Sequence, residues 1–168
     1  MAGIRRITPE KDGSTTINYI VNELLRPDIR KALFDDALGG GDISNLLNAP
    51  TTKIYGIFSK GLPEPAGVVF FVGVWPYRDT TVYSAIFDKE NRKKGMITEV
   101  YEQIKKDIME RYAVHSVTAQ TVGNNLASMK TLEKIGFEKI GVKKKGIFSE
   151  GKYKDITIFY MLLDGQEE

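Results

Sequence analysis

The spacing of apolar residues changes along the chain, and each change marks a different kind of element. Over residues 97–112 apolar side chains recur three and four positions apart, as at Val100, Ile104 and Ile108. This spacing is the period of a helix with one buried face. The segment before it, residues 82–87, is a short apolar run typical of a buried strand, and a polar turn at 88–95 joins the two. This strand, turn and helix form the predicted central unit of the chain.

The first third of the chain is predicted to be mainly helical. A weak alternation at 3–8 predicts an edge strand, and residues 15–25 and 28–38 each show one apolar face at helical spacing. Three consecutive glycines at 39–41 are expected to end the second helix in a mobile loop. Residues 43–47 then predict one more helical turn.

The remaining segments are predicted to form mostly strands. Residues 66–75 are almost wholly apolar, which predicts a strand covered on both faces near the middle of a sheet. Gly136 is suited to end the predicted helix before Phe137. The other expected elements are strands at 53–59 and 114–122, a helix at 126–135, and two closing strands at 139–145 and 155–163 with a connecting loop at 148–153. Helices that alternate with strands in this way indicate an α/β protein with a mixed sheet.

Composition narrows the function classes. The 168 residues are 42% hydrophobic and 27% charged, which is typical of one globular domain, and we expect a single domain over 1–168. The net charge of +2 gives no argument for a nucleic-acid partner. The chain has no cysteine, which excludes disulfides and thiolate metal ligands, and we predict no metal site. Without an apolar signal or a run near the ~20 residues that span a bilayer, we expect a cytoplasmic protein with no membrane contact.

The turn at 88–95 is a candidate anion site. It carries Arg92, Lys93 and Lys94, and Gly95 directly precedes the predicted helix. The first N–H groups of a helix have no internal partner, and the helix dipole adds partial positive charge there. A pyrophosphate or phosphate ester is the natural guest of such a turn. The structural alternative is a basic loop that is simply solvated.

The same turn resembles the pyrophosphate motif of the GNAT superfamily of N-acetyltransferases. Residues 92–97 match the motif's Arg and first Gly, while Ile97 stands where the family has Gly or Ala. The resemblance implies about seven mostly antiparallel strands, about four flanking helices and a splayed central parallel pair. It also implies acetyl-CoA as cosubstrate, with a backbone N–H near 86–88 facing the acetyl carbonyl. The implied cofactor-binding residues are Phe87, Asp88, Arg92, Lys93, Lys94, Gly95, Met96, Ile97, Asn125 and Ser128.

The C-terminal half is similar to the RimJ/RimL-like branch of that superfamily. The matching segments are Asn125-Leu126-Ala127-Ser128, Leu132-Glu133-Lys134-Ile135-Gly136-Phe137, Gly151-Lys152-Tyr153-Lys154-Asp155 and Tyr160-Met161-Leu162. In that branch the serine hydroxyl serves the leaving thiolate, which makes Ser128 the predicted catalytic residue. Many other members use a tyrosine one helical turn later, where this chain has Leu132. The structural alternative is that Asn125 and Ser128 only cap the helix.

The acceptor side is less defined by the sequence. We expect Tyr83 and Tyr153 to line an amine pocket, with packing as the alternative for Tyr153. An alkyl ammonium with a pKa near ~10 must lose a proton before it attacks. We cannot place the base that takes this proton, although Asp88, Tyr83 and His115 are nearby titratable groups.

Together these features predict an acetyl-CoA-dependent N-acetyltransferase that transfers acetyl directly to a primary amine. The acceptor is left open between a protein N-terminus, another peptide amine and a small-molecule amine, and a homodimer is left open too. The alternative is a GNAT-fold protein without turnover that acts as a binding or assembly factor. Ile97 and the missing base favour that alternative, whereas Asn125, Ser128 and the terminal motif oppose it.

Overall fold

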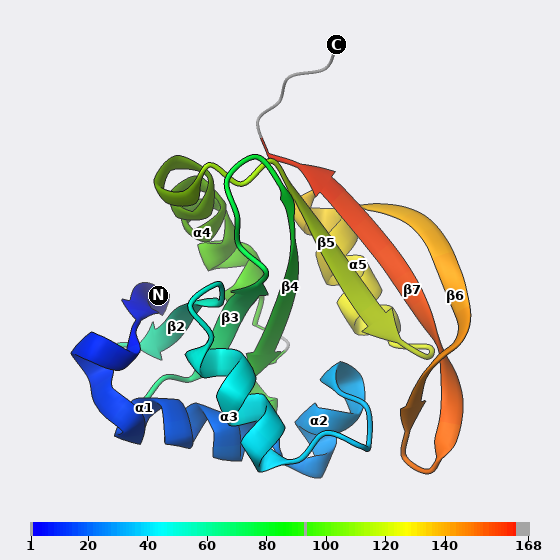
Figure 1. The fold of residues 1–168 in the computed structure, drawn as a ribbon, viewed down its shortest axis with the longest axis horizontal. Helices are drawn as coiled ribbons and strands as arrows, with labels where there is room; N and C mark the ends of the chain where they lie inside the picture. The colour runs from blue at the N-terminus through cyan, green and yellow to red at the C-terminus, as the bar shows by residue number, and fades with distance from the viewer. Residues whose placement is uncertain (1, 93, 164–168) are drawn as a thin grey trace.

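A mixed seven-stranded sheet forms the centre of the molecule (Figure 1). The structure, a computed structural model, describes residues 2–92 and 94–163. The strands lie in the order β1-β2-β3-β4-β5-β7-β6, and every neighbouring pair is antiparallel except β4 and β5. Their bounds are β1 (Ala2–Ile7), β2 (Lys53–Ser59), β3 (Gly67–Val72), β4 (Asp79–Ile86), β5 (Ser116–Val122), β6 (Glu138–Ser149) and β7 (Lys152–Leu162).

Helices cover both faces of the sheet and create two cores. One face carries α1 (Pro9–Leu24), α2 (Pro27–Leu33) and α3 (Gly40–Asn48), and the other carries α4 (Met96–Tyr112) and α5 (Leu126–Ile135). A short 3₁₀ helix, η1 (Lys89–Asn91), follows β4. Side chains of β3 alternate between the cores, with Val68 and Phe70 in one and Val69 and Phe71 in the other. The predicted strand with two buried faces is therefore confirmed over Gly67–Val72, whereas Trp75 lies beyond its end and is exposed.

The parallel pair β4–β5 separates along its length. The two strands pair only from Asp79↔Ser116 to Val82↔Ala119. Beyond that point β4 continues to Ile86 alongside β3, and β5 continues to Val122 alongside β7. The predicted fold class, with a splayed central parallel pair in a mostly antiparallel sheet, is confirmed. Within residues 2–92 and 94–163, the splay leaves one edge of each strand without a backbone partner in the middle of the sheet.

Two predicted loops differ in the structure. Helix α2 ends at Leu33, and Gly40 begins helix α3 instead of lying in a loop. The Asp42 side chain accepts a hydrogen bond from the Gly39 N–H at 2.8 Å, so a carboxylate in the first turn satisfies the helix start. Strands β6 and β7 also extend into the predicted loop at 148–153, and the described turn between them is only two residues long.

The tip of the β6–β7 hairpin is fastened to the segment between α2 and α3. The Asp36 carboxylate accepts hydrogen bonds from the N–H groups of Glu150 and Gly151 at 3.1 and 2.9 Å. The Asp36 N–H donates to the Phe148 carbonyl at 2.8 Å, and the Asp35 carboxylate accepts from the Phe148 N–H at 3.1 Å. These bonds order the hairpin tip and hold it beside α2, at one side of the splay.

Candidate functional site

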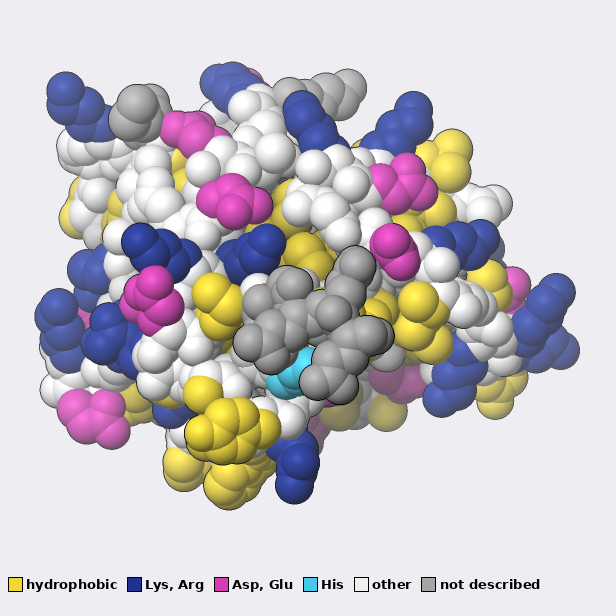
Figure 2. Space-filling model, turned by 90° about the horizontal axis from the view of Figure 1, so that it is seen from above, with side chains coloured by type: hydrophobic (Ala, Val, Ile, Leu, Met, Phe, Trp, Pro, Cys, Tyr) yellow, Lys and Arg dark blue, Asp and Glu magenta, His cyan; other side chains and the backbone are white. Residues whose placement is uncertain are grey.

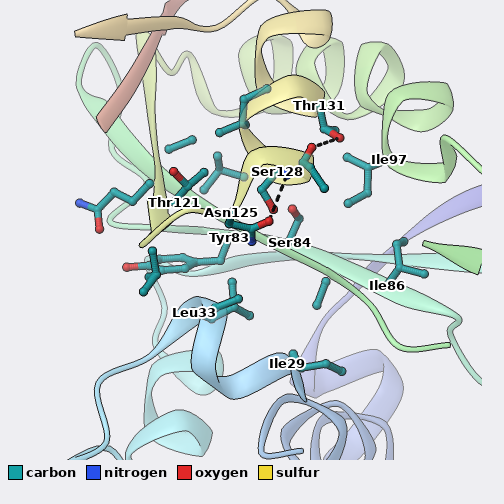
Figure 3. Close-up of a pocket in the computed structure, with 18 of the residues that line it drawn as sticks. Ile29, Leu33, Tyr83, Ser84, Ile86, Ile97, Thr121, Asn125, Ser128 and Thr131 are labelled. Atoms are coloured by element: carbon teal, nitrogen blue, oxygen red, sulfur yellow. Dashed lines mark hydrogen bonds between the residues drawn. The ribbon is translucent and has the colours of Figure 1, made fainter. Parts of the chain in front are cut away.

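A cavity of about 340 Å³ opens where β4 and β5 separate (Figure 3). Its walls come from both faces of the sheet. Ile29 and Leu33 of α2 line one side, and Ser128 and Thr131 of α5 line the other, with Ile97 of α4. The cavity therefore passes through the sheet at the splay, which gives two groups that approach from opposite faces a place to meet.

Two helix N-termini border the cavity on the α4–α5 side. Helix α4 starts after Gly95, whose φ of 69° is the left-handed conformation that favours glycine. Helix α5 starts after Asn125, whose side-chain oxygen accepts a hydrogen bond from the Ser128 N–H at 3.3 Å. Ile97 near the first start and Ser128 near the second both line the cavity. Because helix N-termini attract anions, this side suits a phosphate-bearing ligand.

Backbone amides of β4 face the open splay. The Phe87 N–H donates to the Ala66 carbonyl at 2.9 Å, on the β3 side. Successive amides of a strand point to opposite edges, so the N–H groups of Ile86 and Ser84 point to the β5 side. Both residues lie beyond the last β4–β5 pair and line the cavity. They are positioned to donate hydrogen bonds to a carbonyl oxygen placed between the strands.

Arg92 ties the end of β4 to helix α2. Its Nε donates to the Ile86 carbonyl at 2.8 Å, and its Nη2 donates to the Phe87 carbonyl at 3.3 Å. The same Nη2 pairs with Asp28 Oδ2 at 2.8 Å, and Arg26 pairs with that oxygen at 3.1 Å. The hydrogen bond from Arg92 lowers the pKa of the Asp28 carboxyl, and the charge of Arg26 acts in the same direction. Asp28 is therefore an ionised carboxylate with two cationic partners.

The structure brings part of the predicted site together. Tyr83, Arg92, Ile97, Asn125 and Ser128 line the cavity. Lys93 lies outside the described residues. The other predicted residues are not among those that line the cavity, namely Phe87, Asp88, Lys94, Gly95, Met96 and Tyr153.

The positions of three of those residues have clear local causes. Phe87 is buried in the α1–α3 core, where its ring packs edge-on against Tyr19. Asp88 caps η1, since its carboxylate accepts a hydrogen bond from the Glu90 N–H at 2.9 Å. Tyr153 lies on the hairpin, packs edge-on against Phe148 and is 66% exposed. Gly95 and Met96, in contrast, form the start of α4 beside the lining residue Ile97.

Tyr83 is held rigidly in the wall on the α2 side. Its ring stacks between Phe70 and Phe34, with centroids 5.1 and 6.0 Å away. Burial raises the pKa of its phenol, so the hydroxyl stays protonated at neutral pH. His115 precedes the paired end of β5, away from the splay, and Figure 2 views the molecule from that end. Tyr83 is thus the one of the three suggested titratable groups that reaches the cavity.

Sequence reasoning missed two buried hydroxyl groups in the cavity wall. Tyr101 of α4 is 3% exposed and Thr121 of β5 is 2% exposed, and both line the cavity. Within the described part of the chain, neither hydroxyl oxygen has a hydrogen-bond partner. Such atoms normally find a partner when they are buried. They suit a ligand with polar groups on the α4–α5 side. The helical periodicity assigned Tyr101 to the core. The one signal that could have marked it as a site residue was a hydroxyl group among apolar neighbours.

Two classes of feature are missing from residues 2–92 and 94–163. No helix there is long and apolar enough to cross a membrane. No group of three or more His, Cys, Asp or Glu side chains there could hold a metal ion. On the face shown in Figure 2, Lys and Arg side chains are interspersed with Asp and Glu rather than gathered into one basic patch.

Comparisons with known proteins show a family match and similar folds. The model of the acetyltransferase (GNAT) domain family matches residues 43–158. A solved spermidine N-acetyltransferase from Vibrio cholerae, in complex with CoA and spermine, has a TM-score of 0.78 at 14% identity, covering 96% of this chain and 95% of that one. A solved ribosomal-protein-S5-alanine acetyltransferase from Vibrio fischeri has a TM-score of 0.76 at 18% identity, covering 99% of this chain and 96% of that one. A solved ribosomal-protein-S18-alanine N-acetyltransferase from Escherichia coli has a TM-score of 0.71 at 13% identity, covering 100% of this chain and 97% of that one. These structures share the fold. A search of curated proteins finds no significant match.

Proposed function

Because this chain belongs to the GNAT acetyltransferase family, we propose that it transfers an acetyl group from acetyl-CoA directly to a primary amine, in the manner of the RimJ/RimL-like branch. The observation that carries the proposal is the cavity that crosses the sheet at the β4–β5 splay. Direct transfer needs an amine beside a thioester, and a cavity lined by residues from both faces of the sheet suits that arrangement.

The α4–α5 side of the cavity would hold the cosubstrate. The start of α4 at Gly95, Met96 and Ile97 offers unpaired backbone N–H groups to the pyrophosphate, and Lys94 adds charge next to it. Asn125 caps α5 at the second helix start. The hydroxyls of Tyr101 and Thr121, which have no hydrogen-bond partner in the described part of the chain, fit the polar groups of the pantetheine arm. When bound, acetyl-CoA supplies the activated thioester.

Two groups of the chain act on the reacting atoms in this proposal. The N–H groups of Ser84 and Ile86 stabilise the negative charge that develops on the acetyl oxygen while the amine nitrogen bonds to the carbonyl carbon. The Ser128 hydroxyl donates a hydrogen bond to the sulfur as the carbon–sulfur bond breaks. In the described residues no hydrogen bond occupies that hydroxyl, and its residue lines the cavity. The amine proton leaves to solvent through the open cavity.

The alternative is a factor that binds without turnover, and it requires a blocked cavity. Tyr83, Phe148 and Tyr153 are the aromatic side chains that we would expect to block it. Tyr83 is held in the wall by its two stacking partners. Phe148 and Tyr153 pack on each other at the hairpin and do not line the cavity. This arrangement favours the enzyme over the binding factor.

Release of thiol from acetyl-CoA tests the proposal. We expect acetyl-CoA to raise the melting temperature, because a ligand that binds only the folded state stabilises it. We also expect release of CoA above the hydrolysis background with at least one member of an amine panel of peptides, alkylamines, polyamines and aminoglycosides. Gly95→Pro should abolish the thermal shift, because proline cannot adopt the φ of 69° seen there. Silence across the panel together with no thermal shift would refute the enzyme.

A further inference from the structure

The α2 side of the cavity has an unusually uniform chemical character. Its wall is built from Ile29, Ala32, Leu33, Val122 and Ile147. The polar residues that accompany them are Tyr83, whose ring is stacked in the wall, and the exposed Gln120. The ion pair of Asp28 with Arg92 lies at the border of the same cavity. If the cosubstrate lies on the α4–α5 side, as proposed above, this apolar wall faces the acceptor.

The charges that border the cavity neutralise each other. Among the described residues that line it, the charged side chains are Asp28 and Arg92, which pair at 2.8 Å. Asp28 has Arg26 as a second cationic partner at 3.1 Å. The described wall therefore offers no carboxylate that is left over for a substrate cation. A second ammonium group placed against this wall would lose its hydration without gaining an ion pair, which is strongly unfavourable.

We infer that the acceptor is a primary amine whose body is apolar and which carries no second positive charge. This inference rests on the proposed function and names the substrate class for the same site. An alkyl or aryl body would lie against Ile29, Leu33 and Ile147, and its single amine would reach the splay in the neutral form. The similar fold from Vibrio cholerae holds spermine, a polycation. The inference excludes polycations of that kind as acceptors for this chain.

Two amines of equal length give the sharpest test. Hexylamine and hexane-1,6-diamine differ only in the second amino group, so their rates can be compared at equal concentration of reactive amine. We expect kcat/KM for hexylamine to exceed that for the diamine by at least about tenfold. This ratio corresponds to a penalty of ~1.4 kcal/mol for the uncompensated charge. Spermidine should be slower again, and phenethylamine should resemble hexylamine.

A single introduced carboxylate should shift this preference. Gln120 is exposed at the cavity and Glu is its isostere, so Gln120→Glu should fold normally and add one unpaired negative charge. We expect it to raise the ratio of kcat/KM for the diamine to kcat/KM for hexylamine about fivefold to tenfold. Gln103→Glu is the matched control, because Gln103 is exposed on α4 and does not line the cavity.

The outcomes separate the inference from the function that it rests on. If the diamine or spermidine is used as well as hexylamine, or if Gln120→Glu leaves the ratio unchanged, the inference is overturned and the acetyltransferase assignment stands. If no amine in either series releases CoA and acetyl-CoA causes no thermal shift, the proposed function fails and the inference falls with it. A preference for hexylamine that is reduced by Gln120→Glu but not by Gln103→Glu supports both the inference and the proposed function.

Discussion

Removal of the Asp28–Arg92 pair should weaken the fold by an amount that can be worked out from the structure. The pair joins the first turn of α2 to the end of β4, and its two side chains are 23% and 32% exposed. Exposed ion pairs contribute about 0.2–1 kcal/mol to the free energy of unfolding, and partial burial places this one near the upper end. Arg92 also donates to two β4 carbonyls, so we expect Arg92→Ala to lower that free energy by about 2 kcal/mol.

A double-mutant cycle isolates the ion pair from those other bonds. Asp28→Ala, Arg92→Ala and the double variant should show a coupling energy of about 1 kcal/mol in urea unfolding at neutral pH. In a domain of this size about 2 kcal/mol corresponds to about 4–8 °C in Tm. A coupling energy near zero would mean that the two side chains do not pair in solution, and the neutral cavity rim inferred above would lose its basis.

The pH dependence of this coupling has a definite sign. The pKa of Asp28 is lowered below its ordinary value of 3.8 in the folded chain, chiefly by the hydrogen bond from Arg92. The stabilisation is therefore complete above pH 3.8 and is lost as the pH falls through the lower folded-state value. Raising the pH from 5 to 8 should leave the coupling energy unchanged.

The same variants report on the role of Arg92 toward the cosubstrate. If Arg92 contacts the phosphates of acetyl-CoA, Asp28→Ala frees the guanidinium, so the variant should melt earlier alone but gain a larger thermal shift from acetyl-CoA. If Arg92 only tethers β4 to α2, Asp28→Ala should leave that shift unchanged or smaller. The second result would remove Arg92 from the predicted cofactor-binding residues.

Two further variants test hydroxyl groups in the cavity wall. Ser128→Ala should lower kcat by about 10², because a general acid typically contributes a factor of that size to the rate. The acetyl-CoA thermal shift should change little. An unchanged kcat with a lower Tm would show that Ser128 has only a structural role. Tyr101→Phe should raise the melting temperature of the free protein, because it removes a buried hydroxyl that has no hydrogen-bond partner among the described residues. It should also weaken acetyl-CoA binding by about 1 kcal/mol if that hydroxyl contacts the ligand. A lower Tm with unchanged acetyl-CoA affinity would contradict both expectations for Tyr101.

Periodicity predicted the core elements well because their burial is repetitive. The helix expected at 126–135 has those bounds in the structure, and the helix expected at 97–112 starts one residue earlier. Segments held by isolated polar contacts were harder to predict. Gly40 begins a helix because the Asp42 carboxylate satisfies its start, and the β6–β7 turn is short because the Asp36 carboxylate binds two of its N–H groups. Neither partner is visible in local spacing.

The residues on the two sides of the candidate site also differed in how well the sequence predicted them. Arg92, Ile97, Asn125 and Ser128 lie close to helix starts, where turn chemistry marks them in the sequence, and all of them reach the cavity. The wall proposed to face the acceptor comes from α2, β5 and β6, which are distant in the chain and meet only through the tertiary fold. Tyr153 was expected in that wall, but the docked hairpin leaves it exposed, while Ile147 lines the cavity instead.

Capping and the proposed chemistry at Ser128 use different atoms of the residue. Its backbone N–H donates to the Asn125 side chain, which satisfies the start of α5. Its hydroxyl is a different group, and no hydrogen bond among the described residues engages it. Because Asn125 provides the cap, the helix does not need the Ser128 hydroxyl for its own stability. Asn125→Ala should therefore lower stability by about 1 kcal/mol, whereas Ser128→Ala should lower turnover with little loss of stability. The cap engages the Ser128 backbone N–H, and Ser128 lines the cavity at the splay.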